Sequence, residues 1–128
     1  LPVMDMRGYQ NYKMQSINTM TKGELLLLLY DELVKRLTQA ELALDKKEFE
    51  PFEASVQRGI EIITYLDDTL DMKYEVSHGL TKLYEHFTYE LGRAKIGRNP
   101  EPLGRVKKMV SELRDAFREA QKTGDSGR

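Results

Sequence analysis

Apolar residues recur at steps of three and four through almost the whole chain, and this spacing constrains its fold more than any other feature. Four stripes carry the pattern, over residues 26–44, 52–70, 76–94 and 103–120. No stretch alternates apolar and polar residues as a half-buried strand does. Because the connections are short, consecutive helices must lie antiparallel. The sequence predicts an all-α, antiparallel up-and-down four-helix bundle with an N-terminal arm or short helix.

Local sequence marks where the helices begin and end. Thr21 and Glu24 form the capping box that satisfies free amide groups at a helix N-terminus. Pro51 suits the first turn of the second helix, where its missing amide proton is not needed. At the end of the third helix, Gly97 is placed to adopt a left-handed conformation and Pro100 cannot continue the helix.

Length and composition suggest one cytoplasmic domain. We expect an N-terminal arm at residues 1–20, partly disordered, a bundle at 21–122 and a disordered tail at 123–128. The chain has no cysteine, which excludes disulfides and thiolate zinc sites and is typical of a reducing compartment. No run approaches the roughly 20 apolar residues of a membrane span, and the first residues lack a signal-peptide layout.

The charges are numerous but balanced, with 20 basic and 21 acidic residues. Nucleic-acid binding normally requires a basic excess, because phosphate neutralisation supplies most of the affinity. The sequence therefore predicts no nucleic-acid partner.

The two histidines are candidate metal ligands. A di-iron bundle needs two Glu-x-x-His pairs and two further inward carboxylates. Glu75 and His78 match this spacing once, but Leu83 stands three residues before His86. We expect no metal and no cofactor, with His78 on the polar side of its helix.

Catalysis is not expected either, because no nucleophile–base set and no glycine-rich phosphate loop can be found. The alternative function is a histidine phosphotransfer-like signalling bundle with His78 or His86 as acceptor. Gly79 and Lys82 beside His78 are compatible with a bound phosphoryl group.

The chain carries more apolar residues than a bundle core needs. About three positions per heptad suffice, yet residues 25–29 are five successive leucines followed by Tyr30. The third helix is also wide, with Tyr74, Tyr84 and Tyr89 beside its stripe. An arm or a homodimer would cover this excess, and so would a partner's amphipathic helix lying in a groove. Both explanations stay open at this point.

Several short motifs occur in an order and spacing similar to one known family. They are Tyr12, Ile17 and Thr19, then Gly23-Glu24-Leu25, Leu28-Leu29-Tyr30-Asp31, Leu70-Asp71-Met72, Tyr74-Glu75-Val76-Ser77, Leu83-Tyr84-Glu85 and Leu113-Arg114-Asp115-Ala116-Phe117. Over about residues 9–122 the chain resembles the FliS family of flagellar export chaperones. It departs from the family pattern at Lys22, where proline is usual, at Glu32, where a small residue is usual, and at Phe117, where tryptophan is common.

The resemblance implies a function and partners. Family members bind the disordered C-terminal segment of flagellin in the cytoplasm, prevent its premature polymerisation and assist type III export. Contact with the export gate protein FlhA is a further implied property. The residues that we expect to contact a partner are Tyr12, Ile17, Leu25, Leu28, Leu83, Tyr84 and Phe87. Among them Tyr12 and Ile17 belong to the arm, as a gate or edge of the groove, whereas Tyr30 and Asp31 are expected to set the internal geometry of the bundle.

Overall fold

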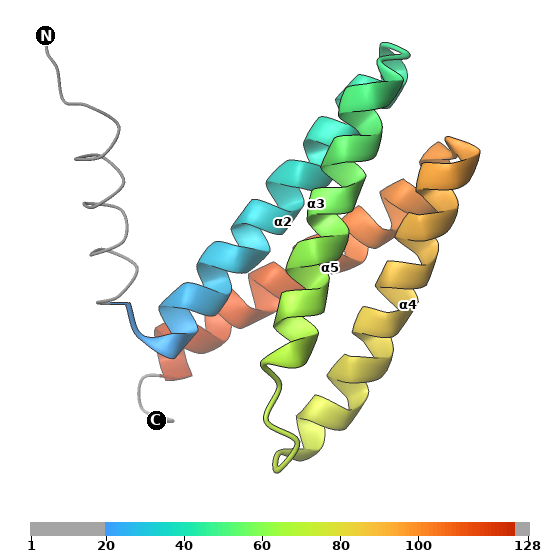
Figure 1. Cartoon of the computed structure of the whole chain (residues 1–128). Helices are drawn as coiled ribbons and strands as arrows, with labels where there is room; N and C mark the ends of the chain where they lie inside the picture. Colours follow the sequence, from blue (N-terminus) through green and yellow to red (C-terminus); the bar gives the residue numbers. More distant parts are fainter. Residues whose placement is uncertain (1–19, 125–128) are drawn as a thin grey trace, which may run out of the picture.

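A computed structural model describes residues 20–124 of the chain, and four helices account for most of them (Figure 1). The helices are α2 (Lys22–Asp45), α3 (Phe49–Asp68), α4 (Glu75–Gly97) and α5 (Pro100–Gly124). No strand occurs between residues 20 and 124. The predicted arm, apart from Met20, and residues 125–128 of the predicted tail lie outside the described residues. Helix α5 continues to Gly124, past the expected boundary at residue 122.

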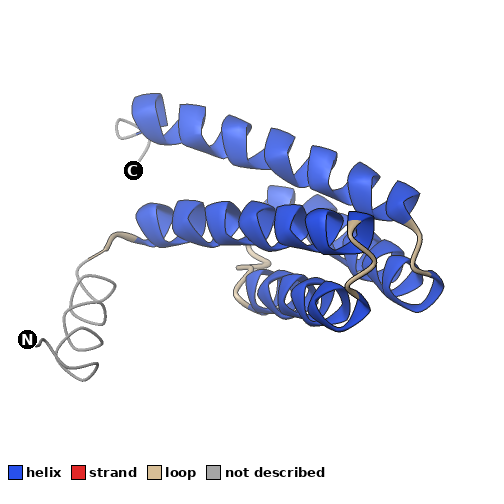
Figure 2. Ribbon diagram, turned by 90° about the horizontal axis from the view of Figure 1, so that it is seen from above, coloured by secondary structure: helices blue, strands red, loops and turns tan. Residues whose placement is uncertain are grey.

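The helices form the predicted up-and-down four-helix bundle. Helix α2 packs against α3 and α5, and α4 also packs against α3 and α5. Figures 1 and 2 show that consecutive helices run in opposite directions and that α5 ends beside the start of α2. The bundle therefore has two ends. At the Thr21 end α2 and α4 begin and α3 and α5 finish, and at the Lys47 end lie the α2–α3 and α4–α5 loops.

The start of α2 follows the predicted capping box. The backbone amide of Glu24 donates to Thr21 Oγ1 at 3.1 Å, and the amide of Thr21 donates to Glu24 Oε1 at 2.9 Å. Pro51 lies in the first turn of α3, which begins at Phe49. The prediction for the end of α4 was wrong in one respect. Arg98 and not Gly97 takes the left-handed conformation, with φ 49°, because α4 continues through Gly97 and the chain reverses one residue later.

The core follows the predicted stripes. Its fully buried members include Leu33, Leu37, Phe52, Val56, Ile63, Leu66, Phe87, Leu91, Leu103, Val106 and Val110. Two predicted stripe residues are instead exposed. Val76 and Ala120 lie in terminal turns of α4 and α5, beyond the region that neighbouring helices cover. None of the helices within residues 20–124 is long and apolar enough to cross a bilayer.

Helices α2 and α3 make a close approach at Gly59. A Cβ atom there would lie 3.1 Å from Leu37 Cδ2 and 3.5 Å from Leu33 Cδ1. Both distances are at or below ordinary van der Waals contact, so the Leu33 and Leu37 side chains of α2 fill the space that a side chain at Gly59 would occupy.

Polar links connect α5 to both α4 and α2. Glu90, a buried residue of α4, accepts from Arg105 of α5 at 2.8 Å and from Arg93 at 3.0 Å. The guanidinium of Arg105 is the main cause that lowers the pKa of the Glu90 carboxyl, and Arg93 adds to it. Asp31 of α2 accepts from Arg118 of α5 at 3.1 Å. Asp31 thus links α2 to α5 through a partly exposed ion pair, and its expected role in the bundle's internal geometry stays a prediction.

Candidate partner-binding surface

The five successive leucines of α2 point in different directions, because each residue of an α-helix turns by about 100°. Leu26 packs against the core. Leu25 and Leu29 face the groove beside α3, and Leu27 and Leu28 face the opposite flank. Part of this run therefore leaves the interior, as its length predicted.

A small hollow lies between α2 and α3 near the Thr21 end. It has a volume of about 330 Å³ and is lined by Leu25, Leu29, Arg58, Glu61, Ile62 and Tyr65. We call it the α2/α3 hollow. The Tyr65 ring is 50% exposed, and Arg58 and Glu61 form an ion pair of 3.2 Å at its rim. An apolar floor with a charged rim is the usual anatomy of a protein-binding patch.

A second hollow occupies the other flank of α2. It is about 590 Å³ in volume and is lined by Met20, Glu24, Leu27, Leu28 and Asp31. We call it the Leu28 flank. Leu28 is 40% exposed, so α2 presents apolar side chains on both sides of its first turns.

Two tyrosines join α2 to α4 beneath this surface. The hydroxyls of Tyr30 and Tyr84 are 2.5 Å apart, and both side chains are buried. The Tyr30 ring also lies 5.9 Å from Phe117, tilted by 52°. Burial is the main cause that raises the pKa of both phenols, so each stays neutral and can donate or accept. The expected role of Tyr30 in the bundle's internal geometry is confirmed.

The structure separates the predicted contact residues into three groups. Leu25 and Leu28 lie at the surface hollows, and Leu83 is partly buried against the core. Tyr84 and Phe87 are 3% and 0% exposed, which leaves no surface for a partner in this arrangement. Their position has a simple reason, since the Tyr84 hydroxyl is satisfied by Tyr30 and the Phe87 ring fills the core.

The arm residues Tyr12 and Ile17 lie outside the described residues. Sequence reasoning also missed Ile62 and Tyr65, which complete the α2/α3 hollow from α3. The available signal was that Ile62 and Tyr65 lie three residues apart, just beside the core stripe of their helix.

The histidines take positions on the outside of α4. His78 is exposed, as predicted, and its Nε2 atom lies 3.1 Å from the carbonyl oxygen of Met72. That contact occupies one of the two ring nitrogens of His78, either of which could accept a phosphoryl group. Within residues 20–124 no group of three or more His, Asp or Glu side chains is placed to hold a metal ion.

Comparison with known proteins identifies the family. The family model described as Flagellar protein FliS matches residues 5–124. The chain belongs to the FliS family. The flagellar secretion chaperone FliS of Bacillus subtilis (strain 168) is 30% identical over 112 residues, which covers 88% of this chain and 84% of that protein. Family membership confirms the resemblance found in the sequence motifs. Neither family membership nor the bundle topology identifies the residues that contact a partner.

Proposed function

We propose that this protein is a cytoplasmic flagellar export chaperone that binds the disordered C-terminal segment of flagellin. Binding would prevent premature polymerisation and keep the subunit competent for type III export. Membership of the FliS family and the secretion-chaperone name of the B. subtilis relative support the proposal. The structural observation that carries it is the pair of apolar hollows on either side of the leucine run of α2.

The energetics of such a partner favour this kind of surface. A disordered segment that folds on binding typically buries on the order of 1,000–3,000 Å² and loses several kcal/mol to ordering. Apolar contact along a track must offset that loss. Leu25 and Leu29 with Ile62 and Tyr65 form one part of the track, and the Leu28 flank forms another. We assign these side chains to partner contact, and Tyr84 and Phe87 to support of the helices that carry them.

Two further roles follow from the family resemblance alone. We propose that Tyr12 and Ile17 gate the groove, and that the chaperone also contacts the export gate protein FlhA. The protein would act through binding and not through catalysis, so its activity is an affinity and not a turnover rate.

The proposal is tested by charging the track. Tyr65→Glu and Leu28→Glu introduce a carboxylate at side chains that are already 50% and 40% exposed, so the helical circular-dichroism signal should persist. Loss of an aromatic anchor typically costs about 2 kcal/mol, or about thirty-fold in affinity. Isothermal titration calorimetry with a peptide of the flagellin C-terminal segment should show that loss.

Ile96→Glu is the matched control, because Ile96 is 86% exposed on α4 and lines neither hollow. It should bind the peptide like the unchanged protein. If Tyr65→Glu and Leu28→Glu both keep full affinity while folded, the proposed track is wrong.

A further inference from the structure

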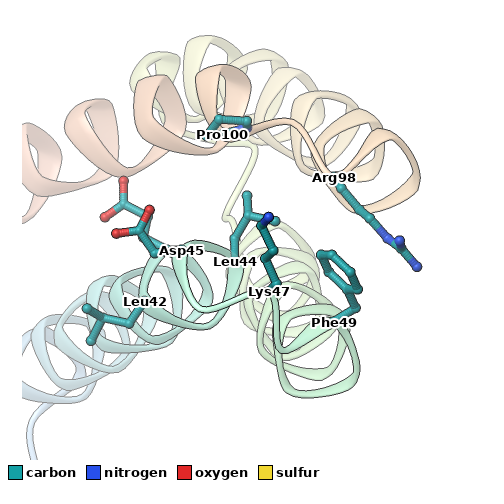
Figure 3. A pocket seen from close by; sticks show the side chains of 8 residues that line it. Leu42, Leu44, Asp45, Lys47, Phe49, Arg98 and Pro100 are labelled. Atoms are coloured by element: carbon teal, nitrogen blue, oxygen red, sulfur yellow. The ribbon is translucent and has the colours of Figure 1, made fainter.

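A larger hollow lies at the Lys47 end of the bundle, away from the leucine run (Figure 3). It measures about 690 Å³ and lies between the α2–α3 and α4–α5 loops. Its apolar lining comes from Leu42, Leu44, Phe49 and Pro100, and its charged lining is two cations, Lys47 and Arg98, and two carboxylates, Glu41 and Asp45. Leu42 is 55% exposed, so an apolar side chain at this end faces solvent as well.

Both cations have an unusual backbone. Lys47 has φ 58° and Arg98 has φ 49°, and they are the two non-glycine residues with positive φ within residues 20–124. Each follows the end of a helix, where glycine is the usual residue because a Cβ atom crowds the left-handed conformation. The protein thus keeps a long basic side chain at two positions where glycine would relieve strain. Strained residues of this kind gather at functional sites.

The basic and acidic side chains around the hollow lie on opposite sides of it. Neither Lys47 nor Arg98 forms a salt bridge within the described part of the chain, and the Arg98 guanidinium lies 3.8 Å from the centre of the Phe49 ring. Across the hollow, Glu41 is neutralised by Lys107 at 2.8 Å. Figure 3 shows Asp45 on the far side of Leu44 from Lys47 and Arg98. The basic side is therefore free to receive an anion next to an apolar floor.

We propose that this hollow binds the free carboxyl terminus of a peptide partner. The terminal carboxylate lies beside the Lys47 ammonium, and the Arg98 guanidinium on the Phe49 ring adds positive charge nearby. An apolar side chain near the peptide's end packs against Leu44 and Pro100. Guanidinium and ammonium groups form charge-assisted hydrogen bonds with a carboxylate. The inference rests on the proposed function, since a C-terminal segment necessarily ends in such a group.

The position of the hollow also sets a length for the partner. The leucine run and the Lys47 end are separated by about 17 residues of α2, or about 25 Å at 1.5 Å per residue. A partner helix that fills both sites therefore needs about 17 residues between its apolar anchor and its carboxyl terminus. The chaperone would in this way distinguish the end of a chain from an internal helix of similar composition.

The test compares two forms of one peptide by isothermal titration calorimetry. The flagellin C-terminal peptide with a free carboxylate should bind about tenfold more tightly than the same peptide with a carboxyl-terminal amide, because the amide removes the charge-assisted bonds. Lys47→Gly should remove most of this preference. The same variant should raise the melting temperature by about 2–4 °C, because glycine relieves the left-handed strain.

Lys46→Ala is the matched control, because it removes the same charge at a neighbour with φ −86° that does not line the hollow. It should keep the preference for the free carboxylate. Arg98→Gly makes the same test in the α4–α5 loop. It should also reduce the preference for the free carboxylate, and it measures that preference even if Lys47→Gly does not fold. Equal affinity of the two peptides would overturn the carboxylate site and leave the proposed function standing. Failure of both peptides to bind would overturn both proposals.

Discussion

The two ends of the bundle are packed differently. In the half toward Lys47, nearly all apolar side chains of the stripes are fully buried, including Leu37, Phe52, Leu91 and Val106. In the half toward Thr21, many are only partly buried against the core, and these are Leu26, Leu29, Ile60, Leu70, Leu80, Leu83, Leu113 and Phe117. Helix α5 ends beside the start of α2 and not beside the start of α4, so the helices cover one another less completely there (Figure 1).

This difference gives each end its own surface chemistry. Where the helices close over the core, the surface carries the charged side chains of the loops and two hollows, one between the loops and one along the end of α4. Where they close less completely, apolar side chains line the surface and a neutral tyrosine pair joins α2 to α4. One fold thus offers an apolar track at one end and a charged, strained site at the other.

The difference in packing between the two ends should be largest in the stability cost of removing a phenylalanine ring from each end. Phe52→Ala at the Lys47 end removes a fully buried ring and should lower the free energy of unfolding by about 3–5 kcal/mol. Phe117→Ala at the Thr21 end removes a partly buried ring and should cost about 1–2 kcal/mol, because part of its area is already in water. Urea unfolding measures both. Equal costs would mean that the two ends are packed equally well.

A smaller effect is expected from the tyrosine pair. Tyr30→Phe leaves the buried Tyr84 hydroxyl without its partner and should cost about 1–3 kcal/mol. The double variant with Tyr84→Phe removes both hydroxyls and should recover most of that loss. Thermal unfolding of the two single variants and the double variant gives the coupling. Additive losses would show that the hydroxyl contact does not hold α4 to α2.

The last prediction concerns pH and the Glu90 contact between α4 and α5. Because its arginine partners lower the pKa of Glu90, the folded state is favoured above the carboxyl's ordinary pKa and loses this contribution as pH falls below about 4.5. Glu90→Gln should therefore be less stable than the unchanged protein at pH 7, and the difference between the two should shrink as the solution is acidified from pH 7 to pH 3. A stability difference that stays constant from pH 7 to pH 3 would exclude this role of the carboxylate.

The sequence predicted the helices and the core because periodicity reports directly which face of a helix is apolar. The capping box at Thr21 and the end of α4 before Pro100 were predicted correctly because both depend on neighbours in sequence. The left-handed residue at the end of α4 was misplaced by one position, because Gly97 and Arg98 both lie where a helix can end and only the three-dimensional path decides.

The candidate surface was harder to predict. Leu25 and Leu28 were correctly expected to leave the core, but the residues beside them on α3 depend on which side of α2 that helix packs. The apolar periodicity of a helix does not show on which side its neighbour packs. The burial of Tyr84 was missed because its hydroxyl is satisfied by Tyr30, 54 residues away in sequence. The hollow at the Lys47 end combines two loops about fifty residues apart and has no local signature.

The close approach at Gly59 has a consequence for how a partner is received. Because the Leu33 and Leu37 side chains of α2 pack against the Gly59 backbone of α3, the two walls of the α2/α3 hollow cannot slide relative to one another without disturbing these core contacts. The receptor is preorganised, so the entropy lost on association falls almost entirely on the incoming chain. The bound conformation of the incoming chain is then determined by the fixed spacing of the hollow's walls, and the chaperone changes little on binding.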